Sequence, residues 1–178
     1  TVHAFRHKDY WYYAKRREQA TMTLCARLIC SGDVVFDVGG HMGYVALYFV
    51  QLVGREGRVF SFEPSPGNLP YIRANLSQAR YGNALFVEKA AGATGGSATF
   101  WAEDLTGQNG SIIPSYYENV AATARSHGVR AETHESHVEV VALDTFAEAS
   151  GVMLDFIKID VEGAEELVLE GMCEILAV

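Results

Sequence analysis

Short apolar runs separated by longer amphipathic segments dominate the pattern of hydrophobic and polar positions along this chain. The runs predict four buried strands, at residues 34–38, 58–63, 84–88 and 154–160. Apolar positions at helical spacing predict helices after the first, second and fourth strands, at residues 43–53, 65–80 and 163–172. Because strands that are apolar throughout are typical of a parallel sheet covered on both faces, the pattern predicts an α/β fold.

The ends of the predicted helices carry local signals. Residues 1–31 are expected to form an N-terminal helical segment that includes the aromatic cluster YWYYAKR. Ser65 is the expected N-cap of the helix after the second strand, with Pro66 in its first turn, although Pro70 leaves a later start open. Asp144 is the expected N-cap of a short helix before the fourth strand.

A long insertion interrupts the regular alternation. Residues 97–102 and 137–143 predict an antiparallel pair of strands, and the segment 103–136 lies between them. Within it, residues 114–128 predict a helix. Because a connection of this length in a small domain usually has a function, we expect the insertion to bind a substrate or to act as a lid.

Length and charge limit the classes of function. The chain has 178 residues, which is the length of one domain. Its formal net charge of −8 is spread along the sequence. Nucleic-acid binding requires a basic face, so we expect a cationic or small neutral ligand and no nucleic acid. No apolar run reaches the roughly 18 residues of a membrane span, and no signal-peptide core is present, so a cytoplasmic protein is expected.

A glycine-rich turn follows the first strand and opens the next helix. Such a turn is typical of nucleotide sites, because glycine lets the backbone approach a ligand. The dinucleotide fingerprint G-x-G-x-x-G, ending at Gly43, requires a glycine at position 38, where this chain has Val38. The pattern present is D-x-G-x-H-x-G, formed by Asp37, Gly39, His41 and Gly43, with Gly40 between.

The acids at the strand ends favour a cofactor that carries a positive charge. Asp37 at the end of the first strand suits an amino group better than a pyrophosphate. S-adenosylmethionine has an amino group and a sulfonium but no phosphate. Glu63 follows Asp37 by 26 residues, the length of one strand–helix–strand repeat, and its carboxylate is placed to accept bonds from both ribose hydroxyls. NAD enzymes place an acid similarly, so Glu63 alone does not separate the two cofactors.

Four motifs in order, between about residues 32 and 172, resemble the FkbM family of S-adenosylmethionine-dependent methyltransferases. They are VVFDVGGHMGYVAL, GRVFSFEPSPGNLPYIRANL, KAAGATGGSATF and VALDTFAEASGVMLDFIKIDVEGAEELVLEGM. The resemblance implies a Rossmann-like class I methyltransferase fold with strand order 3-2-1-4. It also implies methyl transfer, in many members to hydroxyls of sugars or secondary metabolites.

The resemblance also implies roles for individual residues. The turn would shape the methionine end of the cofactor pocket, Glu63 would hold the ribose, and three further residues would lie near the adenine. His41 stands where family members often have Asn, and it would either touch the cofactor or cap the helix. The cofactor-binding residues implied are Asp37, Gly39, Gly40, His41, Gly43, Glu63, Pro64, Ser65 and Ala91.

Candidates for the chemistry follow the fourth strand. Ligands in open α/β sheets bind where strand order reverses, here between the first and fourth strands. Asp160 is the first candidate for a base or acceptor-orienting group, and Glu162 is the second. His134 and His137 are distant candidates if the insertion folds over the site.

Each candidate also has a structural interpretation. Asp160 would bind only the cofactor's amino group, and Glu162 would act only as a charge at a helix N-terminus. Lys158 is expected to neutralise buried carboxylates, since an unpaired buried charge is costly. Tyr116 and Tyr117 are expected to serve in packing. Mg²⁺ is not excluded, because Asp160 would qualify as one ligand.

Two other functions remain open. One is an NAD-dependent oxidoreductase, which Val38 and Asp37 disfavour. The other is a non-catalytic cofactor-binding or partner subunit. Class I methyltransferase sheets have further strands after the fourth, so we expect either a longer natural protein or a homodimer paired along that edge. The leading hypothesis is methyl transfer to a hydroxyl of a small molecule or glycan.

Overall fold

In the computed structural model, which describes residues 1–2, 18–103, 108–126 and 133–177, strands and helices alternate as the hydrophobic pattern predicts. The elements, in chain order, are α2 (Gln19–Leu28), β1 (Val34–Val38), α3 (Tyr44–Val53), β2 (Arg58–Phe62), α4 (Leu69–Leu76), β3 (Ala84–Val87), β4 (Ala90–Ala91), β5 (Gly96–Glu103), α5 (Pro114–Ser126), β6 (Thr133–Val141), α6 (Leu143–Ser150), β7 (Phe156–Ile159), α7 (Glu165–Glu170) and α8 (Cys173–Leu176). No helix among these ranges is long and apolar enough to cross a membrane.

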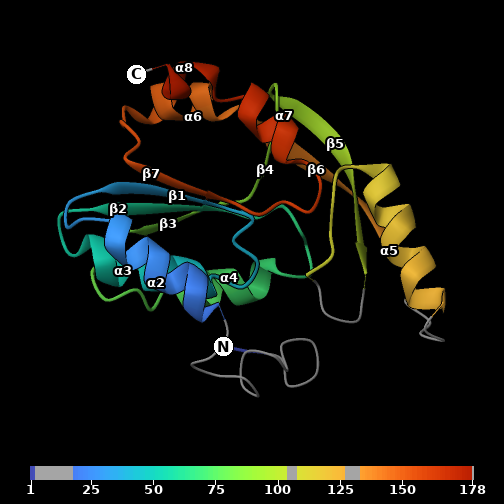
Figure 1. Ribbon diagram of the computed structural model, residues 1–178, viewed down its shortest axis with the longest axis horizontal. Helices are drawn as coiled ribbons and strands as arrows, with labels where there is room; N and C mark the ends of the chain where they lie inside the picture. Colours follow the sequence, from blue (N-terminus) through green and yellow to red (C-terminus); the bar gives the residue numbers. More distant parts are fainter. Residues whose placement is uncertain (3–17, 104–107, 127–132, 178) are drawn as a thin grey trace.

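The main sheet has the strand order β3-β2-β1-β7, and all of its pairs are parallel. The predicted fourth strand is β7, so the predicted order 3-2-1-4 is confirmed. Helices α2, α3 and α4 cover one face of this sheet, and α6, α7 and α8 cover the other (Figure 1). This arrangement is a Rossmann-like α/β fold with its strand ends open to ligand.

Alternation along the strands divides the core into two layers. Val35 and Phe156 pack toward α3, while Phe36 and Ile157 pack toward α6. Phe36 makes an edge-on contact with Phe146 of α6, with ring centroids 5.6 Å apart. Because each fully buried large apolar side chain contributes about 1.5–3 kcal/mol, these layers hold the strand ends in fixed positions.

The strands that flank the insertion form a second, three-stranded sheet with the order β4-β6-β5. Strands β5 and β6 are antiparallel, as predicted, from the pair Gly96 and Val140 to the pair Glu103 and Thr133. The two-residue strand β4 pairs with β6 in parallel, which the sequence analysis did not predict because two residues carry no periodicity. This sheet and α5 lie beyond the strand ends of the main sheet (Figure 1).

The start of the helix after β2 differs from the expectation. Helix α4 begins at Leu69 with Asn68 as its N-cap, so the prediction of Ser65 as N-cap is wrong. Pro70 is tolerated in the first turn because the N–H groups there have no partner within the helix. Helix α2 begins at Gln19, and the aromatic cluster at residues 10–16 lies outside the described residues, as does Gly128 after α5.

Asp144 caps a different helix from the one predicted. Helix α6 starts at Leu143 with Ala142 at its N-cap. The Asp144 carboxylate instead accepts hydrogen bonds at 3.0 Å from the backbone N–H groups of Glu174 and Ile175, in the first turn of α8. These two bonds were not predictable from the sequence, because no periodic pattern marks α8 and the partners are 30 and 31 residues apart.

Replacement of Asp144 should therefore destabilise the C-terminal packing. Asp144→Ala should lower the free energy of unfolding by about 0.5–2 kcal/mol, the usual range for loss of a capping side chain. Asp144→Asn should recover most of this loss because it keeps an acceptor oxygen. Urea unfolding measures the change, with Glu148→Ala, at an exposed position of the same helix, as control. Equal effects of Asp144→Ala and the control would contradict the capping role.

Candidate functional site

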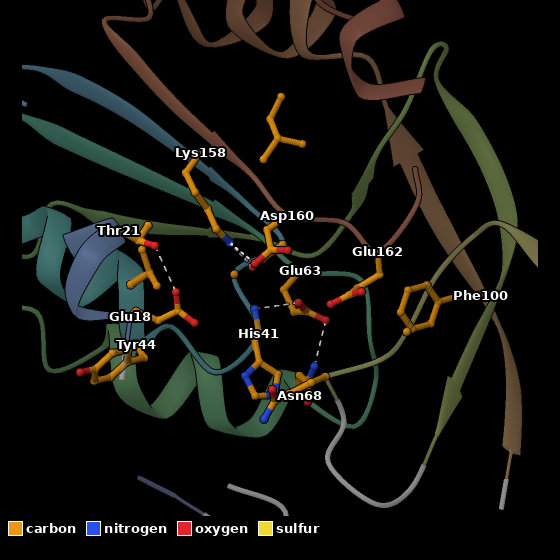
Figure 2. A pocket seen from close by; sticks show the side chains of 16 residues that line it. Glu18, Thr21, His41, Tyr44, Glu63, Asn68, Phe100, Lys158, Asp160 and Glu162 are labelled. Atoms are coloured by element: carbon orange, nitrogen blue, oxygen red, sulfur yellow. Dashed lines mark hydrogen bonds and ion pairs between the residues drawn. The ribbon is translucent and has the colours of Figure 1, made fainter. Parts of the chain in front are cut away.

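A cavity of about 250 Å³ opens where β1, β2 and β7 end. The turn after β1 forms one wall, the residues that end and follow β7 form another, and β5 and the segment after it close a third side (Figure 2). Among the lining residues are Glu18, Thr21, Gly39, Gly40, His41, Tyr44, Glu63, Asn68, Phe100, Gln108, Gly110, Lys158, Asp160 and Glu162. The cavity is therefore at the reversal of strand order, where the sequence analysis expected it.

A row of three polar side chains crosses the sheet behind the cavity. Asp37 on β1 lies opposite Ser61 on β2 and opposite Lys158 on β7. The Ser61 hydroxyl donates to Asp37 Oδ2 at 3.1 Å, and Lys158 Nζ lies 3.4 Å from Asp37 Oδ1. Asp37 is fully buried. An isolated charge there would be costly, so Lys158 neutralises the carboxylate, as the sequence analysis expected.

The charges of this row depend on one another. Burial raises the pKa of Asp37, and the opposing effects of Lys158 and Ser61 only partly offset it. Burial alone would lower the pKa of Lys158, but Asp37 and Asp160 raise it above its ordinary value. Lys158 therefore remains an ammonium, and its Nζ also lies 3.5 Å from Asp160 Oδ2 at the cavity edge.

The glycine turn lies directly on this polar row. Lys158 Nζ donates to the carbonyl oxygen of Gly39 at 3.0 Å. Gly39 has φ +84°, and a Cβ there would lie 1.9 Å from the carbonyl oxygen of Asp160. A Cβ on Gly40 would lie 2.1 Å from Ser61 Oγ. Both positions therefore exclude a side chain, and the turn approaches β2 and β7 as closely as a backbone can.

Three N–H groups of the turn, those of Gly39, Gly40 and His41, are already bonded within the protein. Those of Gly39 and Gly40 donate to the carbonyl of Phe62, at 3.0 and 2.8 Å. The N–H of His41 donates to Glu63 Oε2 at 2.8 Å. A pyrophosphate site needs N–H groups that face the ligand, so this turn is poorly suited to a dinucleotide.

His41 lines the cavity. Helix α3 begins at Tyr44 with Gly43 at its N-cap, so of the two roles considered for His41, capping that helix is not supported. His41 has φ 50°, in the left-handed region that few residues other than glycine adopt. This backbone turns the residue so that its N–H meets Glu63, and its imidazole lies on the cavity wall (Figure 2).

Glu63 is a buried carboxylate at the boundary of the cavity, with only 5% of its surface exposed. Oε1 accepts hydrogen bonds from the Ser65 N–H at 2.9 Å and from Asn68 Nδ2 at 3.2 Å. Burial raises the pKa of Glu63 to about 7, and the hydrogen bonds from Ser65, Asn68 and His41 offset only part of that effect. The carboxyl group thus titrates near neutral pH.

A smaller, mostly apolar slot of about 50 Å³ adjoins the cavity. The slot shares Gly39, Glu63 and Phe100 with the larger cavity, and Pro64 and Ala91 line it as well. The two spaces meet at Glu63, so a ligand with a flat apolar end and a polar end can place a hydroxylated middle beside this carboxylate.

The structure brings most of the predicted site residues together. Gly39, Gly40, His41, Glu63, Asp160 and Glu162 line the cavity, and Pro64 and Ala91 line the slot. Asp37, Gly43 and Ser65 line neither space. Asp37 supports the turn, Gly43 packs against Ile72 and Leu76, and Ser65 donates to Glu63.

Other residues of the site were not predicted. Phe100 reaches it from β5, Gln108 and Gly110 reach it from the insertion, and Glu18 and Thr21 reach it from the start of α2. His134 and His137 lie on β6 and line neither the cavity nor the slot. No group of three or more His, Cys, Asp or Glu side chains suited to a metal occurs in the described part of the chain.

Tyr116 makes a polar contact in addition to packing. Its hydroxyl donates to the carboxylate of Glu162, across from α5 to the segment after β7. Burial and the neighbouring Glu162 raise the pKa of Tyr116 to about 12. The side chain of Tyr117 lies outside the described residues.

Comparison with known proteins gives three findings. Residues 37–178 match the profile of the methyltransferase FkbM domain. Over 56 residues the chain is 41% identical to a protein-L-isoaspartate O-methyltransferase of Methanothrix thermoacetophila, a match that covers 32% of this chain and 27% of that protein. A methyltransferase FkbM structure from Methylobacillus flagellatus has a TM-score of 0.53 at 13% identity and covers 94% of this chain and 47% of its own. The chain spans less than half the length of these proteins.

Loss of the Lys158 ammonium should destabilise the protein. Lys158→Met should lower the free energy of unfolding by about 3–5 kcal/mol, because it leaves the buried Asp37 without its countercharge. Lys158→Met combined with Asp37→Asn should lose less than the sum of the two single changes. Urea unfolding measures all three. Lys89→Met removes the exposed pair with Glu139 and should cost at most about 1 kcal/mol. A similar loss in both lysine variants would show that the buried pair does not organise the sheet.

Proposed function

The chain belongs to the FkbM methyltransferase family, and on this basis we propose that it transfers the methyl group of S-adenosylmethionine to a hydroxyl group of a small molecule or sugar. The observation that carries the proposal is the turn after β1. The N–H groups of Gly39, Gly40 and His41 are occupied by Phe62 and Glu63, so the turn is suited to a cofactor without a pyrophosphate.

The charges around the cavity support a cationic cofactor. Carboxylates of Glu18, Glu63, Asp160 and Glu162 line it, together with the ammonium of Lys158. Lys158 is engaged by Asp37 and Asp160. A ligand with a sulfonium and an amino group therefore meets a negative surface, which favours its binding.

The shape of the site supports the same cofactor. Glu63 accepts three hydrogen bonds from protein donors, and an ionised carboxylate has about four acceptor sites, which leaves capacity for a ribose hydroxyl. The slot beside Pro64 and Ala91 would hold the adenine, and Gly39 and Gly40 would border the methionine part. When bound, this cofactor supplies a methyl group activated by the positive sulfur.

The protein's own residues would orient the acceptor. Methyl transfer is an in-line displacement, so holding the acceptor oxygen in line with the methyl carbon and sulfur lowers the barrier. A neutral hydroxyl is a weak nucleophile, and a carboxylate that accepts its hydrogen bond both orients and activates it. Asp160 and Glu162 lie on the cavity wall where such an acceptor would approach, and they would repel an anionic acceptor (Figure 2).

Titration calorimetry tests the cofactor. The protein should bind S-adenosylhomocysteine and should not bind NADH, because the N–H groups of Gly39, Gly40 and His41 are already bonded within the protein. Methyl transfer from tritiated S-adenosylmethionine to methyl glycosides and small polyols then tests the acceptor class. Binding of NADH in preference to S-adenosylhomocysteine would contradict the proposal. If the protein binds S-adenosylhomocysteine but methylates only amines, the proposed cofactor is right and the proposed acceptor class is wrong.

Cofactor affinity should depend on pH through Glu63. Ribose hydroxyls donate to the ionised carboxylate, and protonation below a pKa of about 7 competes with that interaction. The Kd of S-adenosylhomocysteine should therefore be constant at higher pH and rise toward tenfold per unit as pH falls below about 7.

Glu63→Gln is the matched control for this titration. At pH 8 the Kd of this variant for S-adenosylhomocysteine should be about tenfold to a hundredfold higher, because one charged hydrogen bond contributes about 1.5–3 kcal/mol. Its affinity should not change between pH 6 and 8. The same pH dependence in Glu63→Gln and the unaltered protein would assign the effect to another group.

A further inference from the structure

Glu162 has a backbone conformation that side chains rarely adopt. Its φ is 56°, and the next residue, Gly163, has φ +93°. Left-handed backbone at a residue other than glycine persists only where the surroundings hold it, and it is concentrated at functional sites. The residues that fix the conformation of Glu162 therefore indicate its functional role.

Glu165 fixes the backbone on both sides of Glu162. Its carboxylate accepts hydrogen bonds from the Val161 N–H at 3.1 Å and from the Gly163 N–H at 3.0 Å. Glu165, and not Glu162, is thus the acid that satisfies N–H groups before α7. The alternative role of Glu162, as a helix N-terminal charge alone, is not supported by these bonds.

Tyr116 fixes the side chain of Glu162 from the opposite side. Its hydroxyl donates to Glu162 Oε2, and its ring lies against Gly163, where an added Cβ would be 2.9 Å from Tyr116 Cδ2. The absence of a side chain at Gly163 therefore permits the contact. With a pKa of about 12, Tyr116 keeps its proton and remains a donor at physiological pH.

Asp160 and Glu162 differ in what already binds them. Asp160 Oδ2 is paired with Lys158, and its side chain is 66% exposed. Glu162 is half-buried, and within the described ranges no group donates to its Oε1. Figure 2 shows the Glu162 carboxylate on the cavity side, beyond Asp160 and near Phe100. Each carboxylate thus keeps one oxygen without a donor in the described part of the chain, but Glu162 is less exposed and is held by a neutral hydroxyl, whereas the charge of Asp160 is engaged by Lys158. Glu162 is therefore the better candidate to accept a proton from a ligand.

We propose that Glu162 accepts the hydroxyl proton of the methyl acceptor, and that Tyr116 is a positioning residue that holds the Glu162 carboxylate at the cavity wall. This inference rests on the proposed function. The acceptor oxygen forms a bond to the methyl carbon, and the carbon–sulfur bond breaks with its electron pair going to sulfur. The products are the methyl ether and neutral S-adenosylhomocysteine, and the proton passes from the hydroxyl to Glu162 and then to solvent.

Kinetics of three variants test this assignment, with tritiated S-adenosylmethionine and a panel of methyl glycosides and small polyols. Glu162→Gln should lower kcat by about 10²–10⁴-fold, the usual contribution of a positioned base. Tyr116→Phe should lower kcat by about tenfold and should have no further effect when Glu162 is already Gln, because it acts through that carboxylate. The KM for the donor should change less than about twofold in each variant.

Two measurements do not depend on turnover. The Kd of S-adenosylhomocysteine should be the same in Tyr116→Phe, Glu162→Gln and the unaltered protein. In urea unfolding, the double variant should lose no more stability than the more damaging single variant, because both changes remove one contact. The exposed positions Tyr81→Phe and Glu166→Gln provide matched controls, with kcat unchanged.

Three results would overturn the inference. Loss of transfer in Asp160→Asn with transfer kept in Glu162→Gln would assign the proton to Asp160. If the reductions of kcat in Tyr116→Phe and Glu162→Gln multiply in the double variant, the two residues act separately. If the protein binds S-adenosylhomocysteine but methylates no hydroxyl, Glu162 has no hydroxyl proton to accept and the inference is wrong. Failure to bind S-adenosylhomocysteine at all would instead contradict the proposed function.

Discussion

The buried ion pair between Asp37 and Lys158 is the interaction on which the rest of the site depends. It joins β1 to β7, the strands between which the order of the sheet reverses, and Ser61 extends it to β2. Lys158 also holds the Gly39 carbonyl, so one cation fixes the strands and the turn together. Because removing one partner of a buried pair is far more costly than removing both, the pair specifies a single arrangement of the strand ends.

The chemistry of the cavity follows from that arrangement. The turn lies so close to β2 and β7 that the N–H groups of Gly39, Gly40 and His41 bond to Phe62 and Glu63 and do not face a ligand. Glu63 is buried by the same packing, which moves its titration to near neutral pH. Carboxylates then surround the open side, and the insertion brings Tyr116 to one of them. The cavity at the strand ends of this common nucleotide-binding fold is therefore negatively charged, which favours a cationic ligand over a phosphate.

Sequence predicted the strands and the acids at their ends, because hydrophobic runs and their terminal residues depend on local pattern. The order of the strands in the sheet followed instead from the family resemblance. The sequence also predicted the role of Lys158, since a charge inside an apolar strand needs a partner. Contacts between distant segments were not predictable in this way. Asp144 caps a helix thirty residues away, Tyr116 meets Glu162 from the insertion, and Phe100 enters the cavity from β5. The two acids after β7 were found, but not that a tyrosine of the insertion binds one of them.

A crystal structure of the protein with S-adenosylhomocysteine tests the central claim most directly, that the turn resting on Asp37 and Lys158 forms the cofactor site. The ribose hydroxyls should lie within hydrogen-bond distance of Glu63, with the adenine in the slot beside Ala91 and the amino-acid end against Gly39. Lys158 should still bridge Asp37 and the turn. A ligand bound elsewhere, with the cavity at the strand ends empty, would contradict the account.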